Sequence, residues 1–152
     1  MARLVTRTEI IKAALSWEGT PYQHQCANKH MACDCLGLIC GVWRELFGEL
    51  PAEIPPYSPD WAEAGGAERL LDAARKWLVE KSLEARTPGD VLVFRMNPGA
   101  MAKHMAILIA PDMIIHAYWG RAVTRSFLAP FWIRRLAGVF SFPGCEEPIC
   151  PT

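Results

Sequence analysis

The feature that most constrains the fold is a change in hydrophobic periodicity after Thr87-Pro88-Gly89. Before this point apolar residues recur at helical intervals, whereas after it they occur in short runs typical of strands. Strands are expected at residues 90–95, 104–109, 113–118, 122–125 and 138–142. Because short connections separate them, they should form an antiparallel meander. Helices that precede such a sheet predict an α+β architecture, with N-terminal helices packed on a small antiparallel sheet of about five strands.

The segment before the change predicts three helices. They are expected at residues 6–19, 34–47 and 67–80. Thr6 and Glu9 have the spacing of a capping box, which marks the start of the first helix. Asp34 is a good N-cap for the second. Two aperiodic stretches, residues 23–32 and 51–66, should be loops, and the first leads directly into the second helix.

The composition predicts one domain and excludes several classes of partner. A chain of 152 residues with 51% apolar residues can bury one core, so we expect a single domain over residues 1–143 and a flexible tail over 144–152. The 16 basic and 16 acidic residues balance, which gives no net field to attract nucleic acid or an anionic membrane. No apolar run is long enough for a signal peptide or a membrane span. We therefore expect cytoplasmic synthesis, no nucleic-acid binding and no membrane insertion.

The six cysteines raise the question of a reactive thiol. In a reducing compartment cysteines are free thiols, metal ligands or catalytic groups rather than a disulfide scaffold. Cys35 directly follows the expected N-cap Asp34, so it occupies the first helical position. Unpaired backbone N–H groups and the positive end of the helix dipole favour a thiolate there. The sequence therefore predicts that Cys35 is a nucleophile, which needs a nearby base.

Two histidines on successive expected strands, His104 and His116, are the candidate base and its partner. A two-residue loop at Pro111-Asp112 would place them on opposite faces of the sheet, whereas a three-residue loop or a bulge would place them on the same face. We expect the shared face. His104 would then face Cys35 as the base, while His116 bonds the other ring nitrogen of His104.

Five separated motifs in this order and spacing resemble the NlpC/P60 cysteine peptidases, from about Ile10 to Phe142. They are Gly19-Thr20-Pro21-Tyr22, Asp34-Cys35-Leu36-Gly37-Leu38, Pro88-Gly89-Asp90-Val91-Leu92-Val93-Phe94, His104-Met105-Ala106-Ile107 and Ile114-Ile115-His116-Ala117. Agreement of several motifs is specific where a single match would not be. Two further stretches resemble the branch of the family found in phage tails and gene-transfer agents. These are Tyr22-Gln23-His24-Gln25 and Gly41-Val42-Trp43-Arg44-Glu45-Leu46.

The resemblance implies a papain-like fold and a cysteine peptidase that needs no cofactor and no metal. It implies Cys35 as the nucleophile, His104 as general base and acid, and His116 as the residue that orients His104. Tyr22 and Asp34 would lie at the substrate and oxyanion side of the site, where the Cys35 N–H is the expected oxyanion donor. The implied substrate is a peptidoglycan stem peptide, cut between D-glutamate and diaminopimelate. The enzyme would be incorporated in a virion, with tail proteins as partners, and delivered to the periplasm or cell wall.

Three alternatives stay open at this point. The first is a small zinc site built from Cys26, His30, Cys33 and Cys35, which would make the protein a structural or binding module. The second is a non-catalytic virion or tail component with the same fold. The third is an amidase or acyltransferase that uses the same cysteine and histidine. Leu36 also departs from the serine that many family members carry after the cysteine. The pattern assigns no role to Cys26, Cys33, Cys40, Cys145 and Cys150.

Overall fold

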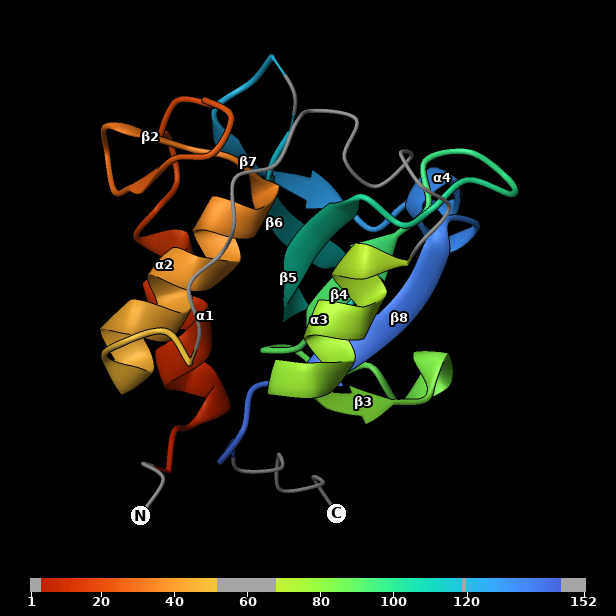
Figure 1. Cartoon of the computed structure of the whole chain (residues 1–152), viewed down its shortest axis with the longest axis horizontal. Helices are drawn as coiled ribbons and strands as arrows, with labels where there is room; N and C mark the ends of the chain where they lie inside the picture. The colour runs from red at the N-terminus through yellow and green to blue at the C-terminus, as the bar shows by residue number, and fades with distance from the viewer. Residues whose placement is uncertain (1–3, 52–67, 119, 146–152) are drawn as a thin grey trace.

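The computed structural model describes residues 4–51, 68–118 and 120–145. They form a six-stranded antiparallel sheet in the order β3-β8-β4-β5-β6-β7, with helices α1 and α2 side by side on one face (Figure 1). The strands are β3 (Val79–Lys81), β4 (Val91–Phe94), β5 (His104–Ala110), β6 (Met113–Ala117), β7 (Val123–Phe127) and β8 (Leu136–Ser141). The predicted α+β architecture is confirmed. No helix among the described residues combines the length and the apolarity that a bilayer crossing requires.

Helix α1 (Arg7–Leu15) begins with the predicted capping box. The Glu9 backbone N–H donates to Thr6 Oγ1 at 3.0 Å, and the Thr6 backbone N–H donates to Glu9 Oε1 at 3.4 Å. The helix ends at Leu15, short of the predicted end near Gly19, which has a φ of +87°. The intervening residues form a turn that leads to Tyr22.

Helix α2 (Cys35–Phe47) begins at Cys35, as predicted, with Asp34 as its N-cap. Two glycines on its surface allow close packing. A Cβ on Gly41 would lie 2.1 Å from the Trp17 ring beside α1, and a Cβ on Gly37 would lie 1.8 Å from the carbonyl oxygen of Cys26. The helix start is therefore held tightly by the segment that precedes it.

The structure differs from the sequence prediction in the sheet and in one loop. The expected helix over 67–80 ends at Trp77, because Leu78 is extended and the next three residues pair with β8 as strand β3. The sheet therefore has six strands rather than five, and β8 returns to pair with β4 instead of continuing the meander beyond β7. The expected loop over 23–32 contains a short hairpin, β1 (Ala27–Asn28) with β2 (Ala32–Cys33).

Three smaller elements complete the described chain. Helix α3 (Arg69–Trp77) packs near β3 and β8, a 3₁₀ turn η2 (Leu83–Ala85) follows β3, and the short helix α4 (Pro130–Ile133) precedes β8. The predicted loop over 51–66 lies outside the described residues after Pro51. In the predicted tail, Gly144 accepts a backbone hydrogen bond from Val5 at 3.0 Å, and residues 146–152 lie outside the described part.

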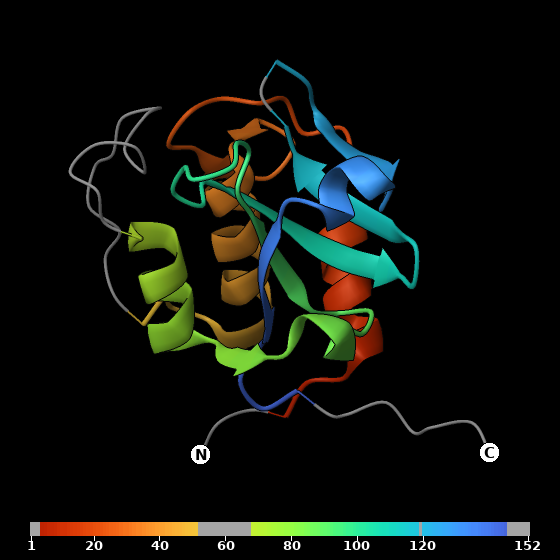
Figure 2. The ribbon, with the colours of Figure 1, turned by 90° about the vertical axis from the view of Figure 1, so that its right-hand side faces the viewer.

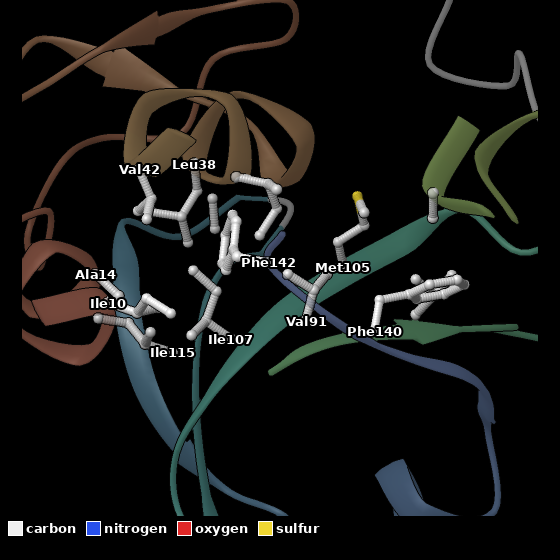
Figure 3. Packing of buried hydrophobic residues seen from close by; sticks show 14 of the residues in the cluster. Ile10, Ala14, Leu38, Val42, Val91, Met105, Ile107, Ile115, Phe140 and Phe142 are labelled. Carbon is white, nitrogen blue, oxygen red and sulfur yellow. The ribbon is translucent and has the colours of Figure 1, made fainter. Parts of the chain in front are cut away.

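Both faces of the sheet are covered by apolar residues. Side chains of Ile10 and Ala14 from α1, and of Leu38 and Val42 from α2, lie over one face of the sheet (Figure 3). The residues beneath them alternate along the strands: Val91, Val93, Met105, Ile107 and Ile115. Figure 2 shows α4 on the opposite face, in front of the strands, with α1 and α2 behind them. Trp132 of α4 packs there against Leu92, Phe94, Ala106, Leu108 and Ile114.

A buried ionic cluster joins the N-terminal helix to the sheet. Asp90, which is fully buried, accepts hydrogen bonds on Oδ1 from Arg7 Nη1 (2.8 Å) and Ser141 Oγ (3.0 Å). Its Oδ2 accepts from Lys81 Nζ (2.8 Å) and the Thr87 backbone N–H (2.8 Å). These five residues, called the Asp90 cluster below, tie α1, β3 and β8 to the start of β4.

Candidate active site

Cys35 lies at the junction of α2 and β5. Its thiol donates to the backbone carbonyl of Lys103 at 3.7 Å, and its sulfur accepts a hydrogen bond from the Met105 backbone. The sulfur therefore contacts the strand backbone on both sides of His104. The thiol thus lies against the backbone that flanks His104, and the role of His104 as its base stays a prediction.

The electrostatics of Cys35 differ from the sequence expectation. Burial, and next the charge of Asp34, raise the pKa of the Cys35 thiol to about 12, although backbone hydrogen bonds act in the opposite direction. The prediction that the helix start would favour a thiolate is therefore wrong for the ligand-free protein. The loss of hydration on burial destabilises the thiolate more than the N–H groups at the helix N-terminus stabilise it. Cys35 rests as a protonated thiol.

His104 and His116 share a face of the sheet, as predicted. The connection is a two-residue turn that pairs Ala110 with Met113, and a register shift after Leu108 supplies the bulge that restores the shared face. His104 Nε2 lies 2.8 Å from His116 Nδ1. The ring nitrogen of His104 that His116 does not engage is thus Nδ1.

A third side chain extends this pair. His116 Nε2 lies 3.0 Å from Ser126 Oγ on β7. The three residues His104, His116 and Ser126 are called the histidine relay below. Sequence reasoning missed Ser126 because the expected strand ended at Arg125; continuing the alternation by one residue would have placed it on the histidine face.

Both imidazoles are neutral at neutral pH. Burial, and next the neighbouring His116, lower the pKa of His104 to about 3, and burial lowers the pKa of His116 to about 4. Trp132 covers the pair: its ring stacks on His104 at a centroid distance of 5.4 Å and meets His116 edge-on at 5.1 Å. Tyr118 closes another side, with ring centroids 5.5 Å from His104. Burial thus leaves His104 unprotonated, as a general base must be at rest, and also makes it a weaker base than an exposed histidine.

Tyr22 and Asp34 occupy different positions relative to the thiol. Tyr22 pairs with Cys33 in an isolated parallel β-bridge, and burial, followed by the neighbouring groups Cys35, Asp34 and Cys33, raises the pKa of Tyr22. Asp34 Oδ1 accepts from the Gly37 N–H at 2.7 Å, and Oδ2 accepts from the Gln25 N–H at 2.8 Å. Asp34 therefore fixes the helix start and the preceding loop. Its predicted place at the substrate side stays a prediction.

The other described cysteines form no alternative centre. Cys26, Cys33, Cys35 and Cys40 are all free thiols. Within residues 4–51, 68–118 and 120–145, no three side chains of His, Cys, Asp or Glu gather as a metal site would require. Burial raises the pKa of Cys33 and Cys40 to about 12, as it does that of Cys35, so position rather than pKa separates them: Cys33 lies in β2 and Cys40 lies inside α2, away from its first residue. The zinc alternative therefore has no support in the geometry, and Cys150 lies outside the described residues.

The arrangement fits acyl transfer through a cysteine. It combines a thiol at a helix N-terminus, a neutral imidazole on the residue whose backbone neighbours contact that thiol, and a second imidazole that holds the first. The backbone N–H groups at the start of α2 are candidate donors for an oxyanion. No cofactor is needed for this chemistry.

Comparison with known proteins agrees with this geometry. The NlpC/P60 family matches residues 19–141. The chain is 26% identical over 114 residues to a protein of Escherichia coli (strain K12) described as "Probable endopeptidase NlpC", covering 74% of this chain and 62% of that protein. The chain thus spans less than two thirds of this curated relative.

Solved structures agree at the level of the fold. An NlpC/P60 family protein from Bacillus cereus has a TM-score of 0.64 at 21% identity, covering 91% of this chain and 40% of that one. The NlpC/p60 domain of the peptidoglycan hydrolase SagA has a TM-score of 0.62 at 22% identity, covering 91% of this chain and 100% of that one. Because the family match includes Cys35, both histidines and most of the sheet, the chain belongs to the NlpC/P60 family.

Proposed function

We propose that this protein is a cysteine endopeptidase that hydrolyses peptidoglycan stem peptides. The observation that carries the proposal is the 2.8 Å contact between His104 and His116, together with a thiol at the start of α2 that contacts the backbone on both sides of His104. Family membership supports the reaction class. The printed descriptions of two relatives, an endopeptidase and a peptidoglycan hydrolase, support the substrate.

In the proposed reaction, His104 Nδ1 accepts the proton of the Cys35 thiol, which leaves the Lys103 carbonyl as the sulfur attacks the peptide carbonyl carbon. The oxyanion that forms accepts hydrogen bonds from backbone N–H groups at the start of α2. His104 then gives its proton to the leaving amine, and a thioester remains on Cys35. Water, deprotonated by His104, hydrolyses the thioester and restores the thiol.

The proposed scissile bond joins D-glutamate to diaminopimelate, as the family resemblance implies. The test uses a synthetic stem peptide attached to N-acetylmuramic acid, with products identified by mass spectrometry. The expected products are a fragment ending in D-glutamate and a fragment with a new amino terminus on diaminopimelate. Release of the intact peptide from the sugar would instead identify an amidase. Transfer of the acyl group to an added amine in preference to water would identify an acyltransferase.

We also propose that the protein belongs to the phage and gene-transfer-agent branch and acts from within a virion. The support is the sequence resemblance at residues 22–25 and 41–46. Proteomic analysis of purified particles from a producing culture tests this proposal. The protein should co-purify with the particles and survive removal of free protein. Its presence only in the soluble cell fraction would contradict delivery inside a virion.

A further inference from the structure

Ser126 is the outermost member of the histidine relay. On β7 it pairs across from Ile114, while Thr124 pairs across from His116. Both hydroxyl residues therefore lie on the histidine face of the sheet, one directly opposite His116 and one diagonal to it. Ser126 Oγ contacts His116 Nε2 at 3.0 Å, whereas Thr124 Oγ1 donates to the Arg125 carbonyl at 3.4 Å.

The direction of the proton chain depends on this outer contact. For His104 Nδ1 to accept a proton, the proton of the neutral His104 ring must sit on Nε2 and be donated to His116 Nδ1. The proton of His116 must then sit on its Nε2, which requires an acceptor. Ser126 Oγ is that acceptor. The reverse arrangement, with Ser126 donating, would place the His104 proton on Nδ1 and prevent base catalysis.

The contact gains strength during the reaction. When His104 takes the thiol proton, the pair carries one positive charge, and each ring must donate outward along the relay. A hydrogen bond to a charged group is stronger than one between neutral groups. The relay therefore stabilises the protonated pair more than the resting pair, which is the condition for lowering a barrier.

We propose that Ser126 is a positioning residue for the Cys35 and His104 chemistry: it accepts the His116 Nε2–H and so fixes the tautomer of both histidines. It acts through His116 and has no contact with the substrate in this account. Its catalytic consequence rests on the proposed peptidase function. Its effect on the tautomers does not.

The kinetic test compares Ser126→Ala with Thr124→Ala, which removes a hydroxyl from the same strand and face without touching the relay. Ser126→Ala should lower kcat about tenfold at unchanged KM, and Thr124→Ala should match the wild type. Ser126→Thr, which keeps the hydroxyl, should restore most of the rate. Equal rates for the two alanine variants, or a Ser126→Ala effect confined to KM, would overturn the proposal.

The second test needs no substrate. Nitrogen-15 NMR of histidine-labelled full-length protein at neutral pH distinguishes protonated from unprotonated ring nitrogens. In the wild type, His116 Nε2 should be protonated and Nδ1 unprotonated, and Ser126→Ala should mix the two tautomers. A wild-type His116 protonated on Nδ1, or tautomers unaffected by Ser126→Ala, would overturn the proposal. A wild type that cleaves no stem peptide but shows the expected tautomers would refute the proposed function alone.

Discussion

The histidine relay and the Asp90 cluster are both groups of buried polar side chains in one sheet. They differ in charge and in how far the protein's own groups fill their hydrogen-bonding sites. The Asp90 cluster pairs a carboxylate with two cations, and each carboxylate oxygen accepts two hydrogen bonds. The histidine relay is neutral, and its contacts run from Ser126 on β7 through His116 to His104.

This difference separates a structural cluster from a reactive one. A carboxylate whose acceptor sites are filled by its own fold has little capacity left for a substrate, so the Asp90 cluster contributes to holding α1 against the sheet. The histidine relay ends at a base whose Nδ1 is not engaged by His116. Burial keeps that base unprotonated at rest.

The largest expected effect is that of removing the base. His104→Ala should lower kcat by at least about a thousandfold, because no other group takes the thiol proton, while thermal unfolding shows a folded protein. His30→Asn is a matched histidine control on an exposed loop position with a φ of +64°, which asparagine tolerates. It should keep wild-type activity. Equal loss in both variants would contradict the assignment of His104.

Removing the carboxylate of the Asp90 cluster should act on stability instead. Asp90→Ala removes the carboxylate that pairs with the buried Arg7 and the partly buried Lys81, which should cost about 3–5 kcal/mol in the free energy of unfolding. Asp72→Ala removes an exposed carboxylate and should change the same quantity by less than about 0.5 kcal/mol. Urea denaturation measures both. A stable Asp90→Ala protein with lost peptidase activity would assign the cluster to the site rather than to the fold.

Weakening the middle of the histidine relay should give an intermediate loss of activity. His116→Ala removes the acceptor for His104 Nε2–H and should lower kcat about a hundredfold. His116→Asn should recover part of this rate, because its amide oxygen can accept the same hydrogen bond at the position of Nδ1. If asparagine and alanine gave the same rate, orientation of His104 would not be the role of His116.

Low pH should lower the free energy of unfolding, because it favours protonation of the two histidines of the relay. The pKa of each histidine falls from about 6.5 in the unfolded chain to about 3 for His104 and about 4 for His116. At a pH between the folded and unfolded pKa values, the unfolded chain binds more protons than the folded chain does. The free energy of unfolding therefore decreases as the pH falls from about 6.5 towards 4.

Each histidine contributes a slope of up to about 1.4 kcal/mol per pH unit. Urea unfolding of wild type and His116→Asn at several pH values measures how the free energy of unfolding depends on pH. The variant should have a shallower dependence on pH. A slope unchanged by the substitution would indicate that other groups govern acid unfolding.

Local patterns were sufficient to predict the elements that carry the two principal site residues. The capping box at Thr6, the cap at Asp34 and the strand that begins at His104 each depend on neighbouring residues in sequence. Their positions could therefore be predicted. The shared histidine face was also predictable as one of two outcomes, and the bulge after Leu108 decided between them.

What the sequence could not predict depends on distant contacts. Residues 79–81 form a strand because their backbone pairs with the edge of β8, and β8 is more than 50 residues away in the chain. The raised pKa of Cys35 arises from burial against β5, which overrides the local helix dipole. Ser126 joins the relay only through the register of β6 against β7.

The most direct test of the account is cleavage of a defined stem peptide by wild type and Cys35→Ala, followed by mass spectrometry at matched folded concentrations. The wild type should cleave the D-glutamyl-diaminopimelate bond and Cys35→Ala should not, and the variant should melt close to the wild type. Cleavage that persists in Cys35→Ala, or a wild-type protein that binds the peptide without cutting it, would contradict the account.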